Sequence, residues 1–237
     1  MGKFSQTMGI IRGIRQQTDT AVLFSSLTGK DSIALTDMLA GMFPKVICYY
    51  MYLIPDLDHV KPFIKWAEGY GNVTIRQIPH YQLDAFLKNG FFCDPDPDVT
   101  RVRRVGEVEQ MVREETGIPY AFSGMKGVDG YMKRMRLKRF AKTGYVTEKG
   151  MVYPLAEWTN KEVMQYIEYR NLPKPFIYKK GEVSQGFGIN LETLLLMRKD
   201  FPGDYDKIMS VFPYSEKLIF DYEEQNKAGR DERGSQE

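Results

Sequence analysis

The chain has 237 residues, 43% of them hydrophobic, so it is long enough to bury a full core as one domain or one domain with an appendage. Its 33 Lys and Arg residues nearly balance its 31 Asp and Glu residues, and a net charge of +2 does not by itself require nucleic acid or a membrane surface as partner. Two cysteines, Cys48 and Cys93, exclude a disulfide framework and a four-cysteine iron–sulfur or zinc site built by one chain.

The N-terminal segment does not have the pattern of a signal peptide, and no apolar run approaches the roughly 18 residues that a membrane helix needs. We therefore expect a cytoplasmic protein without a membrane partner.

Strand-like and helix-like segments alternate over the first two-thirds of the chain. Short apolar and β-branched runs predict strands, and segments with apolar residues on one face predict helices. The predicted strands cover residues 21–25, 45–54, 73–78 and 119–123, and the predicted helices cover 31–42, 57–69, 81–88 and 106–116. The alternation predicts a three-layer α/β fold, in which a mostly parallel sheet has helices on both faces.

After about residue 150 the pattern becomes mostly helical. Thr159, followed three residues later by Glu162, is a capping-box signature for a helix that reaches Tyr169. We expect an α/β core over residues 1–150, a helical C-terminal cap over 151–225 and a disordered tail over 226–237, where apolar residues are almost absent.

The stretch FSSLTGKDS, residues 24–32, joins the first predicted strand to the next helix. Gly29 permits a turn that points N–H groups inward, the hydroxyl side chains add donors, Lys30 adds charge, and the helix presents the positive end of its dipole. These features favour a phosphate-binding loop. Phe24 and Asp31 occupy positions where a Walker A loop needs Gly and Ser or Thr, so that loop type is disfavoured. The alternative is a turn whose Ser, Gly and Asp residues cap the helix.

Ligands of parallel α/β sheets bind at the carboxyl ends of the strands. This loop, Pro55–Asp58 after the second strand and Gly124–Lys126 after the fourth are all at such ends, so we expect them to converge on one crevice. Asp56 could there bind a ribose hydroxyl, hold magnesium or cap the next helix.

Three segments resemble the phosphoadenosine phosphosulfate reductase family of the PP-loop, adenine nucleotide α-hydrolase-like superfamily. Residues 25–32, SSLTGKDS, are similar to its Ser-Gly-Gly-Lys-Asp-Ser loop. Residues 123–133, SGMKGVDGYMK, are similar to its Gly-x-Arg-x-x-x-Ser-x-x-Arg segment. Residues 151–167, MVYPLAEWTNKEVMQYI, are similar to its Pro-Leu-x-x-Trp-Thr-x-x-x-Val-x-x-Tyr-Ile segment. The resemblance implies a nucleotide-binding core that binds ATP or a related adenine nucleotide, and it makes a homodimer reasonable.

The chain departs from the family at several positions. Leu27 and Thr28 stand where the loop has glycines, and Lys126, Gly130 and Lys133 stand where the family has Arg, Ser and Arg. Lys keeps the charge but loses the planar fork of Arg. The reductases attack sulfur with a C-terminal cysteine, whereas no cysteine follows Cys93 here, so that intermediate cannot form on this chain. Because the chain has only two cysteines, we also expect no iron–sulfur cluster.

From this resemblance we expect a site whose reaction cleaves ATP at the α-phosphate, by adenylyl transfer or pyrophosphate release. Mg²⁺ is expected as a cofactor, held by Asp31. The expected catalytic residues are Lys30, Asp31, Lys126 and Lys133. The expected nucleotide-binding residues are Ser25, Ser26, Leu27, Thr28, Gly29, Lys30, Asp31, Ser32, Asp56, Gly124 and Arg134.

Two alternatives remain open. The first is a phosphoadenosine phosphosulfate reductase that releases sulfite by means of Cys93 or a partner's thiol. The second is a nucleotide-responsive binding module that acts with a DNA-associated partner. Its contact would be residues 133–139, which contain five Lys and Arg residues and could bind a protein or a nucleic acid, although a solvated helix face is the simpler interpretation.

Overall fold

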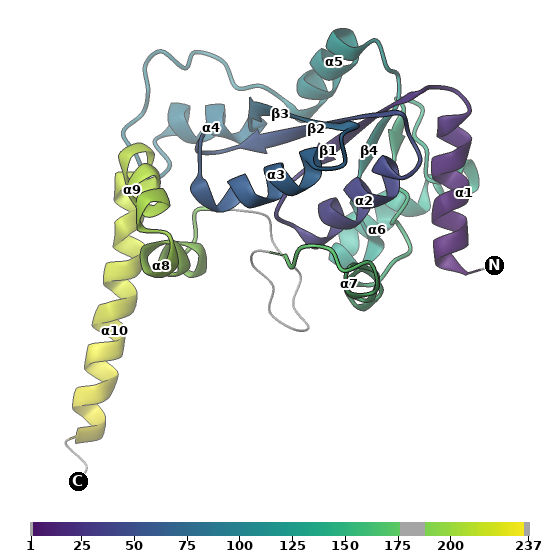
Figure 1. The fold of residues 1–237 in the computed structure, drawn as a ribbon. Coiled ribbons are helices and arrows are strands. Elements are labelled where there is room, and N and C mark those ends of the chain that lie inside the picture. Colours follow the sequence, from purple (N-terminus) through teal and green to yellow (C-terminus); the bar gives the residue numbers. More distant parts are fainter. Residues whose placement is uncertain (1, 176–187, 235–237) are drawn as a thin grey trace. The chain divides into compact units, whose positions relative to one another are not determined.

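The computed structural model describes residues 2–175 and 188–234 of the chain (Figure 1). Its strands are β1 (Thr20–Ser25), β2 (Lys45–Tyr52), β3 (Val73–Pro79), β4 (Ala121–Ser123) and β5 (Met151–Val152). Its α-helices are α1 (Lys3–Arg15), α2 (Lys30–Ala40), α3 (Lys61–Glu68), α4 (Tyr81–Asn89), α5 (Val105–Thr116), α6 (Tyr131–Lys138), α7 (Asn160–Tyr169), α8 (Leu191–Asp200), α9 (Pro202–Val211) and α10 (Glu216–Gly234).

The chain divides into two compact units. The first unit comprises Met1–Tyr52, Val60–Ile78 and Val105–Gly186, and the second comprises Leu53–His59, Pro79–Arg104 and Phe187–Glu237. This division does not follow the boundary expected at residue 150, because β5 and α7 belong with the sheet of the first unit.

The sheet of the first unit has the strand order β3-β2-β1-β4-β5 among the described residues. β1 pairs in parallel with both β2 and β4, and β4 pairs in parallel with β5. The chain therefore runs outward from β1 in one direction through β2 and β3, and then in the other through β4 and β5. The carboxyl ends of β1 and β4 meet where this order reverses, which is the position at which open α/β sheets bind ligands.

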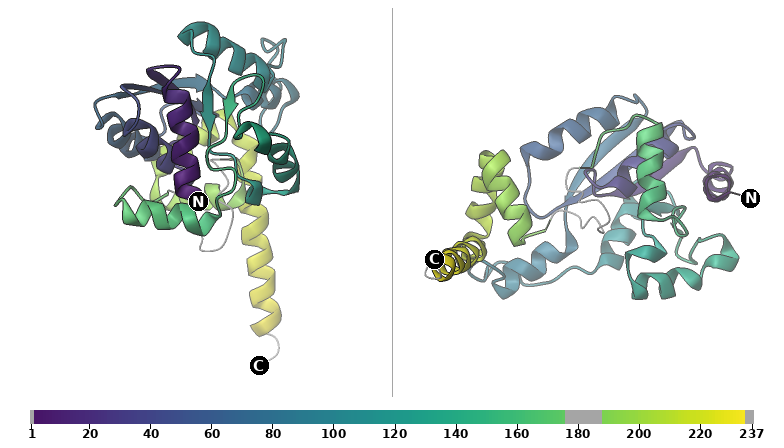
Figure 2. Two further views of the ribbon diagram at one scale, coloured as in Figure 1. Left: turned by 90° about the vertical axis from the view of Figure 1, so that its right-hand side faces the viewer. Right: turned by 90° about the horizontal axis from the view of Figure 1, so that it is seen from below.

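Helices lie on both sides of this sheet, with α5 above the strands and α2 and α3 below them in Figure 1, and Figure 2 shows the same layers from two further sides. The strands are covered on both faces, so β1 and β2 are almost continuously apolar and buried. The expected three-layer α/β fold with a mostly parallel sheet is confirmed.

The second unit contains α4 and the C-terminal helices α8, α9 and α10. Asp204 of α9 is buried and accepts hydrogen bonds from the backbone N–H groups of Asp58 and His59, at 2.5 and 2.9 Å. Its carboxylate also lies 2.8 Å from Nδ1 of the buried His59. Asp204 thus ties the segment that follows β2 to the C-terminal helices of this unit.

Two segments differ from the sequence prediction. Residues 226–234, expected to be disordered, continue α10, where Lys217 pairs with Asp221 and Lys227 with Glu224. Such pairs, one helical turn apart, support a helix whose C-terminal part has few apolar residues. Residues 235–237 lie outside the described residues. The helix α1 was not predicted. No helix in the described ranges is long and apolar enough to cross a membrane.

Candidate functional site

The loop that follows β1 is held in an unusual backbone conformation by its own serines. Leu27 has a φ of 56°, in the left-handed region that residues other than Gly seldom adopt. Its N–H donates to Oγ of Ser25 at 3.0 Å, and the N–H of Thr28 donates to the carbonyl of Ser26 at 2.6 Å. Leu27 stands where the family has Gly, so the backbone of this turn is strained at a residue that has a side chain. Strain of this kind is concentrated at functional sites.

Gly29 brings the loop against the first turn of α2. It is the N-cap of α2, which has no side-chain cap, and a Cβ at this position would lie 2.6 Å from Oγ of Ser26. The N–H of Ser26 donates to Oγ of Ser32 at 2.9 Å, and the two hydroxyl oxygens are 3.1 Å apart. The loop therefore folds back over a helix N-terminus, whose first N–H groups and dipole attract anions.

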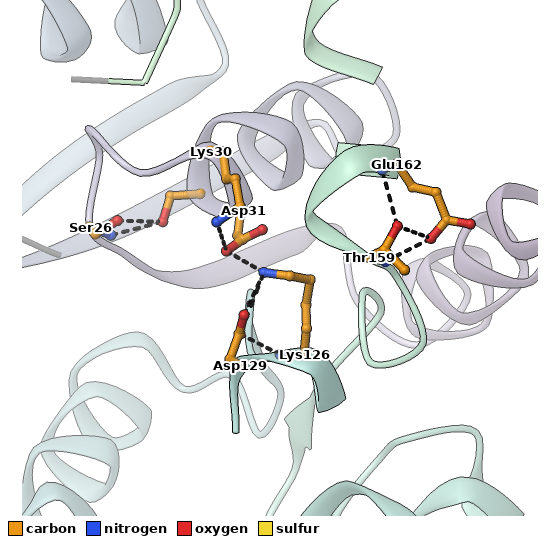
Figure 3. Close-up of polar contacts among 8 residues, drawn as sticks. Ser26, Lys30, Asp31, Lys126, Asp129, Thr159 and Glu162 are labelled. Carbon is orange, nitrogen blue, oxygen red and sulfur yellow. Dashed lines mark hydrogen bonds and ion pairs between the residues drawn. The ribbon is translucent and has the colours of Figure 1, made fainter. Parts of the chain in front are cut away.

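Four charged side chains meet beside this loop (Figure 3). Nζ of Lys126 lies 2.5 Å from Oδ2 of Asp31 and 3.1 Å from Oδ1 of Asp129, and Nζ of Lys30 lies 3.5 Å from the same Oδ2 of Asp31. Both lysine side chains are fully buried, whereas that of Asp31 is 21% exposed. We call these four residues the loop charge cluster. It joins the loop after β1 to the loop after β4, as the sequence predicted for two of the three loops.

The loop charge cluster contains equal numbers of positive and negative groups. Burial lowers the pKa of Lys30, although the neighbouring Asp31 opposes that shift. Because each lysine faces a carboxylate, the cluster by itself offers no excess positive charge to a phosphate. The groups of this loop that suit an anion are therefore the first N–H groups of α2 and the hydroxyl donors.

Asp129 was missed by the sequence analysis. It accepts from the backbone N–H of Lys126 at 3.0 Å as well as from its ammonium group. The signal in the sequence was a carboxylate three residues after Lys126, the spacing of a capping interaction. In addition, a Cβ on Gly124 would lie 2.8 Å from Cβ of Asp31. Only a residue without a side chain permits this approach of β4 to α2.

Asp31 does not face a group of ligands suited to a metal. Its Oδ2 contacts two ammonium groups, and among the described residues no three His, Cys, Asp or Glu side chains gather as a metal site. The structure thus gives Asp31 the role of a partner for buried lysines.

Lys133 and Arg134 lie on α6 and are exposed to solvent. Nε of Arg134 donates to the carbonyl of Gly127, the residue after Lys126, at 3.3 Å. Gly130, where the family has Ser, has a φ of 147° that L-residues rarely adopt. Within the described part of the chain, neither cation forms an ion pair with the loop charge cluster. A catalytic role for Lys133 and a nucleotide-binding role for Arg134 stay predictions.

Asp56 belongs to the second unit, where it also has a positive φ, of 55°. Its carbonyl accepts from Nζ of Lys207 at 2.5 Å, and the same ammonium group contacts the carboxylate of Asp58 at 3.3 Å. A role for Asp56 in nucleotide binding stays a prediction.

Both cysteines are buried. Burial raises the pKa of Cys48 in β2 to about 12. The pKa of Cys93 is raised by burial and by the nearby carboxylates of Asp94 and Asp96. Both side chains are therefore protonated thiols at neutral pH, whereas nucleophilic cysteines are thiolates.

The segment around Trp158, which directly precedes α7, is attached to α1. Nε1 of Trp158 donates to Oγ1 of Thr7 at 2.8 Å, and Thr7 donates to the carbonyl of Pro154 at 2.7 Å. Thr159 and Glu162 form the predicted capping box at the start of α7. These contacts give the segment a structural role, since it anchors α1 and begins α7.

A family model for the phosphoadenosine phosphosulfate reductase domain matches residues 20–208, most of the chain. Among solved structures, the chain is similar to the U34-tRNA thiolase NcsA from Methanococcus maripaludis with its [4Fe-4S] cluster. The two share 17% identity over 92% of this chain and 80% of the thiolase, with a TM-score of 0.44. No curated protein matches the chain.

This comparison corrects the cofactors expected from the sequence. The similar thiolase structure carries a [4Fe-4S] cluster, which disagrees with the cofactors expected from the sequence, namely ATP or a related adenine nucleotide with Mg²⁺ and no iron–sulfur cluster. The residues described here do not fit a cluster by themselves, since the chain has two cysteines, each buried, and no group of metal ligands gathers around them.

The family match includes each of the segments that carry the resemblance: the loop after β1, the loop after β4 and the start of α7. The chain therefore belongs to the phosphoadenosine phosphosulfate reductase domain family.

Proposed function

We propose that the loop between β1 and α2 binds the phosphates of ATP as a substrate, and that the protein cleaves it at the α-phosphate. The observation that carries the proposal is the uncapped N-terminus of α2, which lies behind a strained serine loop where the strand order of the sheet reverses. Membership of a family named for its action on an adenine nucleotide supports the choice of adenine nucleotide.

The loop would contribute mainly position and charge. The exposed Ser26 and the N-terminal turn of α2 would hold phosphate oxygens, while Lys126 keeps Asp31 from repelling them. Lys133 and Arg134, exposed on α6, are proposed to reach the outer phosphates.

The reaction is a displacement at phosphorus. A nucleophilic oxygen of the acceptor forms a bond to the α-phosphorus, and the bond from that phosphorus to the bridging oxygen breaks. Pyrophosphate leaves with the bonding electron pair, AMP remains on the acceptor, and any hydroxyl proton of the acceptor passes to solvent. With water as acceptor the products are AMP and pyrophosphate.

The test is the formation of labelled AMP from α-labelled ATP and of labelled pyrophosphate from γ-labelled ATP, with and without added Mg²⁺. Ser26→Ala removes an exposed hydroxyl of the loop, and Ser5→Ala removes an exposed hydroxyl of α1 as the matched control. We expect the Ser26 variant to lose about tenfold or more in rate, the scale of one lost hydrogen bond to a charged group, while the control keeps its rate. Equal rates in all three proteins would contradict the assignment of the loop.

The reductase alternative is weakened by the state of the thiols. Neither Cys48 nor Cys93 is poised as a thiolate, so sulfite release would require a thiol from a partner. Phosphoadenosine phosphosulfate supplied with thioredoxin tests this alternative. We expect no sulfite from the wild type; sulfite that disappears in Cys93→Ser would restore Cys93 as the nucleophile.

A further inference from the structure

A run of cations on and after α6 is exposed on the first unit. The α6 basic patch consists of Lys133, Arg134, Arg136, Lys138, Arg139 and Lys142, all exposed. From residue 130 to residue 147 the sequence has no Asp or Glu. Leu137 is the buried residue of α6, and the other side chains of this helix are exposed.

The patch is unusual in gathering six exposed cations on one short segment that contains no Asp or Glu. Elsewhere in the described ranges, the exposed Arg198 pairs with Glu223 and Lys217 with Asp221, whereas exposed cations without an ion pair, such as Arg12, Lys45 and Lys65, lie on separate elements. In the ranges 2–175 and 188–234, no ion pair involves a residue of the α6 basic patch.

Two arginines of the patch are instead positioned by neutral groups. Arg134 donates to the carbonyl of Gly127, and Arg136 donates to the hydroxyl of Tyr153 at 3.2 Å with its guanidinium 5.9 Å from the centre of that ring. Their charges are thus oriented and uncompensated, which is the condition for binding an external anion.

We propose that the α6 basic patch binds the phosphodiester backbone of a nucleic acid. Several cations in a short segment match a strand with one negative charge per nucleotide, and the arginine fork suits phosphate oxygens. Tyr131 and Met132, 70% and 76% exposed, stand at the start of the same helix and offer an aromatic ring and a soft thioether to an unpaired base.

An acidic protein is the less fitting partner. Protein interfaces have an apolar centre from which charges are depleted, whereas cations cover the middle of α6 and its C-terminal end. The proposal does not depend on the reaction in the loop, since the residues tested below lie outside the predicted nucleotide site.

The test is fluorescence anisotropy of labelled single-stranded RNA, single-stranded DNA and duplex DNA of matched length across a series of salt concentrations. The patch variant is Lys138→Glu/Arg139→Glu/Lys142→Glu. The matched control is Arg12→Glu/Lys45→Glu/Lys65→Glu, which changes the net charge equally at exposed positions on other elements. ATP titration and circular dichroism of each protein check that the fold and the loop are unaffected.

We expect the wild type to bind at least one of the nucleic acids with a linear dependence of log affinity on log salt concentration. The patch variant should lose about tenfold or more in affinity, and its salt slope should fall by about 2, as three lost phosphate contacts on a single strand imply. The control should stay within about twofold of the wild type.

Equal losses of affinity in the patch variant and the control would show that net charge alone explains the effect, and would overturn the proposal. So would the absence of binding to every nucleic acid at low salt, or selective binding of polyglutamate in their place. If the patch variant does not fold, the same affinities are compared between Lys138→Gln/Arg139→Gln/Lys142→Gln and the control Arg12→Gln/Lys45→Gln/Lys65→Gln. The same outcomes then support or overturn the proposal.

Discussion

Lys126 is the residue on which the loop charge cluster depends. Its ammonium group is fully buried and serves the carboxylates of Asp31 and Asp129, which come from different segments of the first unit. Replacing Lys126 with Met leaves Asp129 without its partner and Asp31 with the more distant Lys30 alone, at 3.5 Å. Removing one partner of a buried ion pair costs about 3–5 kcal/mol, and we expect the lower end because Asp31 is partly exposed.

Urea denaturation of Lys126→Met measures this loss. Lys65→Met, at an exposed position on α3, is the control and should unfold close to the wild type. Adding Asp129→Asn to Lys126→Met should recover part of the lost stability, because the unpaired carboxylate of Asp129 is then gone while Asp31 still faces Lys30. A loss no larger than that of the control would show that the cluster does not stabilise the fold.

At this scale the sequence predicted which two loops lie together better than it predicted their contacts. The strand, Gly29 and the helix after it locate the loop, and the spacing of Gly124 and Lys126 locates the facing segment. It could not predict that Asp31 and Asp129 neutralise Lys126, because that pairing depends on how β1 and β4 lie beside each other.

Asp37 links α2 to α7 and to the end of α3. It is buried and accepts hydrogen bonds from the hydroxyls of Tyr70 and Tyr166 and from two nitrogens of Arg170. Burial alone would raise the pKa of Asp37, but the hydrogen bonds from Arg170, Tyr166 and Tyr70 outweigh it and lower the pKa. The stabilisation is therefore present above the unfolded-state pKa, about 3.9, and is lost as the pH falls through the lower folded-state value.

We predict that Asp37→Asn lowers the free energy of unfolding by about 3 kcal/mol at pH 7. The gap to the wild type should narrow as the pH falls below about 4, since protonation then removes the same charge from the wild type. Urea denaturation of both proteins at several pH values measures this difference in the free energy of unfolding. Asp19→Asn, which breaks the exposed pair with Arg15, is the control and should show little change at any pH. A gap that stays constant down to pH 2 would be inconsistent with this role.

α1 is attached to the segment before α7 through Thr7. Thr7→Val keeps the shape of the side chain but removes both the acceptor for Trp158 and the donor to Pro154. Leaving these buried groups unpaired should cost about 1–3 kcal/mol in thermal or urea unfolding. The exposed Ser5→Ala on the same helix should be neutral, and a Thr7 variant as stable as that control would refute the attachment.

The elements that the sequence predicted well are those with a strong apolar period. The strands at 21–25, 45–54 and 73–78 and the helices after them match β1 to β3 and α2 to α4 to within a few residues. α1 was missed because it has few apolar residues. Only the folded protein shows that Thr7, Ile11 and Ile14 form its buried face. β5 is two residues long and is a strand because β4 lies beside it, so no local pattern indicates it.

At the scale of the whole molecule, the family and the fold class were predictable because they rest on motif order and on the alternation of strands and helices. The division into units was not. Leu53–His59 and Pro79–Arg104 join the C-terminal helices through contacts such as His59 with Asp204 and Tyr214 with Asp94, which connect residues more than a hundred positions apart. Hydrophobic periodicity reports local helices and strands, so it does not predict contacts between residues this far apart in the sequence.

The most direct test of the account is calorimetric titration of ATP into the wild type and two glycine variants at opposite ends of α2. Gly29→Ala would place a Cβ 2.6 Å from Oγ of Ser26, whereas a Cβ at Gly41 would make an ordinary 3.5 Å contact. Both glycines have a negative φ, so neither substitution strains the backbone.

We predict that the wild type and Gly41→Ala bind ATP with the same affinity, and that Gly29→Ala loses about tenfold or more because the loop no longer fits the phosphates. Undiminished binding by Gly29→Ala, or no ATP binding by the wild type, would contradict the assignment of this loop as the nucleotide site.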